Sequence, residues 1–399
     1  MFHIRPTIVT IAALSSALAL AGCSRGALIT PPASGTAYSK AALPLATPGP
    51  PRNPNGLVAV GDTLYGTTYN GGTRARGNVF SITTAGKERN LYSFQIGAKS
   101  TAALIDVNGV LYGTTSKGGT GYGTAFGISA STYKLGLNYS FGAVPDASFP
   151  QAALIAYNGL LYGTSENGGT SDDGAVFVID PASGKETVLY SFKSGTDGDS
   201  PASNLMLFNG KFYGTTMFGG SSSGVGNGTI YQLDPSTGAE KVVYSFTGGS
   251  DGAQPSSGLR ALNGKLYGVT LHGNGGNYGV VFSFDPATGK EIALHAFGGG
   301  TSDGFLPNGN LAAIDGMLYG TTFAGGSTDN GTVFVANPAT ETAHVIYSFH
   351  GSTDGISPAS GVIAHKGVLY GTTSAGGTNN NGTVFSLTTS GFEKTLHVF

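Results

Sequence analysis

The chain has 399 residues, of which 67 are glycine, while Lys and Arg total 20 and Asp and Glu total 22. Charged residues make up 11% of the chain, well below the roughly 25% of typical soluble domains, and glycine weakens a helix interior by about 1 kcal/mol relative to alanine. The composition therefore argues against a helical protein. A hydrophobic content of 40% argues against a disordered chain. A net charge of −2 gives no sign of the excess positive charge that is typical of nucleic-acid-binding proteins.

The N-terminus is the first segment with a recognisable pattern. Arg5 precedes an apolar run from Ile8 to Leu20 that is too short to span a membrane. The sequence Leu20-Ala21-Gly22-Cys23 follows and resembles the lipobox of a bacterial lipoprotein signal peptide. The resemblance implies that residues 1–22 are removed and that Cys23 carries diacylglycerol and an acyl chain such as palmitate. It also implies that Ser24 favours the outer membrane of a two-membrane cell. The alternative is an ordinary signal peptide with an incidental cysteine.

Residues 23–54 form a second segment, which is rich in small residues and proline and has no strand or helix pattern. We interpret it as an extended tether between the lipid and the folded part of the chain. Cys23 is the only cysteine, so no intramolecular disulfide supports the fold. The prolines of the tether are Pro31, Pro32, Pro44, Pro48, Pro50, Pro51 and Pro54.

Beyond the tether, a tripeptide recurs at intervals of about 50 residues. Seven repeats account for residues 55–399, and a period of this length indicates an array in which no unit can bury its apolar face alone. The tripeptides are Leu64-Tyr65-Gly66, Leu111-Tyr112-Gly113, Leu161-Tyr162-Gly163, Phe212-Tyr213-Gly214, Leu266-Tyr267-Gly268, Leu318-Tyr319-Gly320 and Leu369-Tyr370-Gly371.

Each repeat contains four short β-prone runs separated by turn signals. Asn-Gly or Asp-Gly joins the first two runs in five repeats, and this is the strongest short hairpin signal. The pattern predicts an all-β fold, a seven-bladed β-propeller of four-stranded antiparallel blades in which the recurring aromatic residues pack between blades. In repeat six the runs are Asn310–Ile314, Met317–Thr322, Thr332–Ala336 and His344–Phe349.

The closure of the ring has two possible arrangements. Either the seventh blade is made wholly from repeat seven, or the last strand, which ends at Phe399, pairs with the strands of repeat one. The sequence shows no matching strand before Gly56-Leu57, which slightly favours the second arrangement.

The repeats resemble the bacterial tandem repeat called GloVer, whose pattern is carried here by Tyr244-Ser245-Phe246, Asp251-Gly252, Leu266-Tyr267-Gly268 and Gly331-Thr332-Val333-Phe334. The resemblance covers all seven repeats. It implies a surface repeat protein with a lipoprotein signal among its possible anchors, and it supplies no catalytic residue.

One face of the predicted ring carries the longer and more variable loops, where binding sites concentrate. These loops lie between the second and third strands, and the links between blades lie on the same face. The links carry acidic residues at repeated positions, the first of which is Asp146. These acids suggest a calcium site, but Asp also accepts hydrogen bonds from turn N–H groups, so we expect no cofactor and keep calcium as the alternative. The candidate calcium ligands are Asp197, Asp251, Asp303 and Asp354.

The positions at which the repeat varies on this face are the candidate binding residues. They follow the Gly-Thr-Thr column and change their chemistry from one repeat to the next: Lys117, Glu166, Met217, Phe218, His272 and Phe323. His295 and His397 stand in a column of tyrosines, and we expect them to replace an aromatic residue in the core.

The sequence thus predicts a lipid-anchored, non-enzymatic envelope protein that presents a variable loop face to a protein or a glycan. We expect a monomer that contacts the membrane only through its lipid and binds no nucleic acid. One alternative is an envelope hydrolase or lyase with a metal or an acid/base pair at the central channel; a purely structural surface protein is another.

Overall fold

The computed structural model describes residues 49–95, 99–221, 225–273, 275 and 278–399. The predicted signal peptide, Cys23 and most of the predicted tether lie outside these residues. The chain divides into the units Met1–Thr47 and Pro48–Phe399, and every described residue belongs to the second unit.

The second unit is built from β-sheets, mostly of four antiparallel strands, and the described residues contain no helix that is both long and apolar enough to cross a membrane. Repeat one forms β1 (Gly49–Val60), β2 (Thr63–Gly72), β3 (Asn78–Thr83) and β4 (Glu88–Ser93). Repeat two forms β5 (Ile105–Val107), β6 (Val110–Thr115), β7 (Thr124–Ser129) and β8 (Leu135–Ser140). Repeat three forms β10 (Ile155–Tyr157), β11 (Leu160–Ser165), β13 (Ala175–Ile179) and β14 (Glu186–Ser191), beside a short pair, β9 (Ala147–Ser148) and β12 (Asn167–Gly168).

The later repeats continue the same order. Repeat four forms β15 (Met206–Phe208), β16 (Lys211–Thr216), β17 (Thr229–Leu233) and β18 (Glu240–Ser245). Repeat five forms β19 (Ala253–Pro255), β20 (Arg260–Leu262), β21 (Lys265–His272), β22 (Val280–Asp285) and β23 (Lys290–Ala296). Repeat six forms β24 (Gly304–Ile314), β25 (Met317–Gly325), β26 (Thr332–Asn337) and β27 (Thr342–Ser348). Repeat seven forms β28 (Ile356–His365), β29 (Val368–Ala375), β30 (Thr383–Thr388) and β31 (Glu393–Val398), and one parallel pairing of Asn310 with Gly361 joins it to repeat six.

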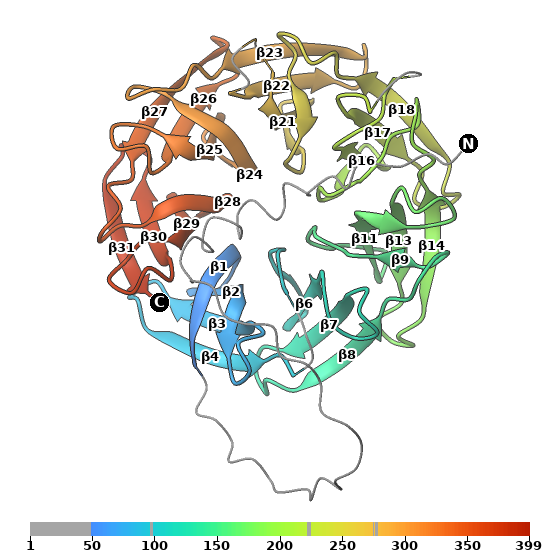
Figure 1. Ribbon diagram of the computed structural model, residues 1–399, viewed down its shortest axis with the longest axis horizontal. Coiled ribbons are helices and arrows are strands. Elements are labelled where there is room, and N and C mark those ends of the chain that lie inside the picture. Colours follow the sequence, from blue (N-terminus) through green and yellow to red (C-terminus); the bar gives the residue numbers. More distant parts are fainter. Residues whose placement is uncertain (1–48, 96–98, 222–224, 274, 276–277) are drawn as a thin grey trace, which may run out of the picture. The chain divides into compact units, whose positions relative to one another are not determined.

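The predicted meander is confirmed, and its first turn shows why. Asn158 and Gly159 both have positive φ, of 50° and 79°, as a two-residue type I′ hairpin requires, and this turn matches the right-handed twist of the strands that it joins. The sheets follow one another around a centre, with the first strand of each sheet innermost and the fourth outermost (Figure 1). The loops between second and third strands and the links between sheets together form one face, which we call the rim; the other turns form the turn face.

The core lies between neighbouring sheets, and we call each such contact a junction, named by the repeats that it joins. At every junction a phenylalanine that ends or follows the fourth strand packs edge-on against an aromatic ring of the next repeat's third strand, with ring centroids 4.9–5.2 Å apart. Such a geometry places the positive edge of one ring on the negative face of the other. The pairs are Phe94 with Phe126, Phe141 with Phe177, Phe192 with Tyr231, Phe246 with Phe282, Phe297 with Phe334, Phe349 with Phe385, and Phe399 with Phe80.

The last of these pairs joins repeat seven to repeat one, and the arrangement that the sequence slightly favoured is wrong. The final strand β31 pairs with β30 of its own repeat, and repeat one has a first strand of its own, because β1 begins at Gly49. Junction 7–1 is instead closed by contacts between two complete sheets: the Asn53 N–H donates to the Asn381 carbonyl over 2.8 Å, and the Thr372 hydroxyl donates to the Asn55 carbonyl over 3.2 Å. β1 was not predicted from the sequence because it contains prolines, which donate no backbone hydrogen bond and are uncommon inside strands.

Candidate functional site

Lys117 and Glu166 lie on the rim and meet at one segment, residues 149–151. The Lys117 ammonium lies 4.4 Å from the centre of the Phe149 ring, a cation–π contact. The Glu166 N–H donates to the Phe149 carbonyl over 3.3 Å, and the Glu166 carboxylate accepts a hydrogen bond from Gln151. Burial raises the pKa of Glu166, while the bond from Gln151 and the charge of Lys117 lower it. Two of the predicted binding residues therefore belong to one network.

The other predicted rim residues follow around the ring. Met217 is buried and its N–H donates to the Ser200 carbonyl over 3.1 Å, so its side chain is part of the scaffold rather than a free ligand contact. Phe218, His272 and Phe323 are partly buried. They come from repeats four, five and six, which separates them along the rim from the network at Phe149.

A second variable column on the rim was not predicted from the sequence. In six repeats the residue before the first-strand proline has a left-handed backbone, with φ between 54° and 57°, and its N–H donates to the glycine loop of the preceding repeat over 2.7–3.0 Å. These bonds tie each sheet to the previous one while leaving the side chain free to vary. A residue of changing chemistry before a recurring proline was the available signal: Asn53, Phe149, Ser200, Gln254, Leu306 and Ser357.

The repeated aspartates bind their own turns. Asp251 accepts hydrogen bonds from the Thr247 N–H over 2.7 Å and from the Tyr244 hydroxyl over 3.0 Å. Asp197, Asp303 and Asp354 likewise accept bonds from nearby N–H groups. Each acid lies in a different link, and among the described residues no three His, Cys, Asp or Glu side chains are grouped so that they could share a metal ion. Calcium binding stays a prediction.

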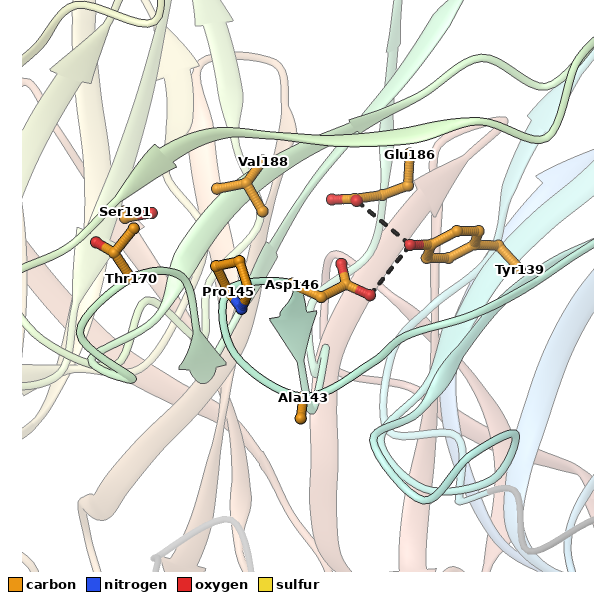
Figure 2. A pocket seen from close by; sticks show the side chains of 8 residues that line it. All are labelled: Tyr139, Ala143, Pro145, Asp146, Thr170, Glu186, Val188 and Ser191. Carbon is orange, nitrogen blue, oxygen red and sulfur yellow. Dashed lines mark hydrogen bonds between the residues drawn. The ribbon is translucent and has the colours of Figure 1, made fainter.

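Two carboxyl groups meet at junction 2–3, an arrangement that sequence reasoning missed. The Tyr139 hydroxyl lies 3.1 Å from Asp146 Oδ2 of its own link and 3.4 Å from Glu186 Oε2 of the next repeat (Figure 2). A tyrosine hydroxyl has one proton, so both contacts are hydrogen bonds only when one carboxyl group is protonated. Burial, reinforced by the negative charge of Asp146, raises the pKa of Glu186 to about 8. Glu186 therefore holds a proton more tightly than an exposed glutamate does.

The same three residue types meet at other junctions. Burial raises the pKa of Glu240 to about 8 and those of Glu291 and Glu393 to about 7, each beside the aspartate of the preceding repeat. At junction 5–6, His295 replaces the tyrosine: its Nε2 lies 3.2 Å from Asp303, and its ring packs edge-on against Phe297 at 4.8 Å. His295 thus takes the place of the aromatic residue, as expected, but its side chain is 23% exposed rather than in the core, and it also contacts an acid.

A cavity of about 470 Å³ opens beside the carboxyl pair at junction 2–3. Tyr139, Pro145 and Val188 provide apolar walls, and Thr170 and Ser191 bring hydroxyl groups to its edge (Figure 2). Tyr139 belongs to β8 and Glu186 to β14, which are outermost strands of their sheets rather than strands at the centre of the ring (Figure 1). Because equivalent pairs recur at other junctions, the pair is a packing feature of the repeat.

Comparison with known families identifies the repeat. The model of the Gloeobacter/Verrucomicrobia repeat matches residues 29–227 and 209–399. The chain belongs to this family. The match confirms, across the whole array, the resemblance to this repeat that was inferred from the sequence. Comparison with curated protein sequences gives no match.

Solved structures resemble this Gloeobacter/Verrucomicrobia repeat protein in fold. A puromycin-hydrolysing peptidase of Mycobacterium tuberculosis is 13% identical with a TM-score of 0.54, over 90% of this chain and 56% of that one. A puromycin hydrolase S511A mutant complexed with PGG is 12% identical with a TM-score of 0.55, over 86% and 53%. The extracellular domain of a hybrid two-component system of B. thetaiotaomicron is 11% identical with a TM-score of 0.53, over 84% and 38%. This chain spans about half or less of those proteins, and the likeness is to a β-propeller-like fold alone.

Proposed function

We propose that the protein is a lipid-anchored, seven-bladed β-propeller whose rim binds a protein or a glycan at the cell envelope. The observation that carries the proposal is the contrast between the junctions and the rim. The aromatic pair recurs at every junction with nearly constant geometry, whereas the rim changes from lysine to glutamate to phenylalanine between repeats. A scaffold whose packing is constant and whose loops vary is typical of a binding protein.

The enzymatic alternative gains no support from the described residues. It requires an acid/base pair or a metal at the central channel, whereas the paired carboxyl groups lie between outer strands and repeat with the fold. We therefore favour binding over catalysis.

The anchor is tested by detergent partitioning of the Cys23→Ser variant. Lipidated protein enters the detergent phase, since each buried methylene contributes about 0.8 kcal/mol to membrane affinity, and the variant should enter the aqueous phase. A wild-type chain that stays in the aqueous phase contradicts lipid anchoring.

Binding by the rim is tested with a glycan and protein array. The double variant Lys117→Ser and Phe323→Ser changes the rim, and a matched double variant, Lys134→Ser and Phe392→Ser, changes the turn face, where Phe392 is 73% exposed. We expect the rim variant to lose ligands that the wild type and the turn-face variant keep. Equal binding by all three proteins, or no ligand at all, contradicts the proposal.

A further inference from the structure

Charge is unevenly distributed along the propeller. Residues 63–145, which form most of repeats one and two, contain seven Lys and Arg against two Asp and Glu, whereas residues 146–399 contain nine against nineteen. A nearly neutral chain thus has a basic sector and an acidic sector, and the field at its surface differs in sign between them.

Four cations of the basic sector lie on the rim: Arg74, Arg76, Lys99 and Lys117. Arg76 Nη1 donates to the Gln95 carbonyl over 3.4 Å, which brings the glycine loop of repeat one against the link that carries Lys99. The Lys99 carbonyl accepts a hydrogen bond from the Ser116 N–H over 2.8 Å, so Lys117 lies beside that link. Arg76, Lys99 and Lys117 therefore lie on neighbouring loops of the rim, and Arg74 lies in the same loop as Arg76; we call these four cations the basic arc.

An acidic side chain lies near the basic arc, since the charge of Lys117 lowers the pKa of Glu166. Within the part of the chain that the structure describes, none of its four cations is in an ion pair. Lys99 Nζ lies 4.1 Å from the centre of the Tyr69 ring and donates to Asn70 Oδ1 over 2.7 Å, and Lys117 lies over Phe149. Aromatic and amide partners orient an ammonium group but leave its charge available to an anion.

We propose that the basic arc binds an anionic polysaccharide, so that the ligand of the rim is an extended chain with repeated carboxylate groups. This inference rests on the proposed function and specifies its partner. A polysaccharide is favoured over an acidic peptide because binding of a peptide depends on a few anchor side chains that fill apolar pockets. Among the described residues, the large apolar side chains that are exposed all lie outside the basic arc: Leu135, Val144, Val225, Tyr278 and Phe392.

The test is binding of a short oligogalacturonate to the full chain in detergent, with the methyl-esterified oligosaccharide, which has the same sugars without charge, as the ligand control. The triple variant Arg74→Gln, Arg76→Gln and Lys117→Gln removes three charges from the basic arc. A matched triple variant, Lys87→Gln, Arg89→Gln and Lys134→Gln, removes three exposed charges of the same two repeats at or near the turn face.

We expect the rim variant to bind the charged oligosaccharide about tenfold more weakly than the wild type, and the turn-face variant to bind it nearly as well. Added salt should weaken wild-type binding, since charges beyond about 10 Å are screened at 0.1 M. Equal losses in both variants, equal binding of the methyl ester, or tighter binding of poly-L-glutamate overturns the inference. If the oligosaccharide fails while the array still shows ligands that need the rim, this inference fails and the proposed function stands.

Discussion

Junctions 2–3 and 7–1 share their inner contacts and differ in their outer ones. Both have the edge-on phenylalanine pair, Phe141 with Phe177 at 4.9 Å and Phe399 with Phe80 at 5.1 Å. Both also have a threonine hydroxyl that donates to a carbonyl of the next repeat, over 3.1 Å from Thr114 and 3.2 Å from Thr372.

The outer contacts diverge because the carboxyl pair of junction 2–3 has no counterpart at junction 7–1. There, His397 takes the place of Tyr139, and Glu88 has no aspartate partner among the described residues, so that burial alone raises its pKa. The difference teaches that the carboxyl pair is not needed to form a junction.

The largest effect should come from truncating the shared phenylalanine. Phe399→Ala and Phe141→Ala each remove a fully or nearly fully buried ring, and each should lower the free energy of unfolding by about 3–5 kcal/mol. Urea denaturation measures both. A cost for Phe399→Ala below half of that for Phe141→Ala contradicts the equivalence of the two junctions.

The next effect concerns a glycine that approaches the next repeat's proline. A Cβ on Gly382 would lie 2.7 Å from Pro54 Cδ and still closer to the Thr373 carbonyl oxygen, at a positive φ that disfavours side chains. A Cβ on Gly123 would likewise lie 2.8 Å from Pro150 Cδ and closer to the Thr115 carbonyl oxygen. Gly382→Ala and Gly123→Ala should each cost about 2 kcal/mol. Gly289→Ala is the control, since its φ is also positive but no neighbour lies within 4 Å. Equal costs at all three positions would mean that backbone strain, and not crowding by the proline and the carbonyl oxygen, is responsible.

The third effect separates the two junctions by pH. The pKa of Glu186 is 4.5 ordinarily and about 8 in the folded protein, so its stabilising contribution is complete below pH 4.5 and is lost as pH rises to about 8. Burial lowers the pKa of His397 below 6.5, so this residue of junction 7–1 contributes stability that is lost as pH falls below that value. Burial raises the pKa of Glu88 at the same junction, and its contribution has the opposite sign.

We therefore expect Glu186→Gln to reduce the fall of the melting temperature between pH 5 and pH 8, by an amount equivalent to about 1 kcal/mol after allowance for solvent screening. The His397→Gln variant should show the same fall of the melting temperature as the wild type between pH 6.5 and pH 8. Calorimetry over the pH range measures both, and an unaltered pH profile for Glu186→Gln contradicts the protonated pair.

The smallest effect should come from the exposed ion pair between Lys366 and Asp62 at junction 7–1, whose side chains are 65% and 73% exposed. Lys366→Ala should leave urea denaturation unchanged, because water screens an exposed pair and its ordering costs side-chain entropy. A clear loss of stability would show that charge, and not the phenylalanine pair, closes the ring.

Much of this architecture was predictable because it is encoded locally. The Asn158-Gly159 turn, the strands around it and the aromatic positions follow from patterns a few residues long, and the structure confirms them. The rim was predicted less completely: Lys117 and Glu166 were identified, but their meeting at Phe149 was not. Phe149 has a left-handed backbone before a proline. This conformation is uncommon for phenylalanine, so the sequence did not indicate it.

By itself, the sequence determined the period, the hairpins and the family, since each of these depends on residues that are near one another in the chain. Only the tertiary structure decided how the ring closes, because Phe399 and Phe80 meet across the whole array. It also decided that Glu186 shares a hydroxyl with Asp146: Tyr139 and Glu186 are 47 residues apart, and their contact exists only because successive sheets pack side by side. The same packing raises the pKa of Glu186, since it removes the carboxyl group from water next to another negative charge.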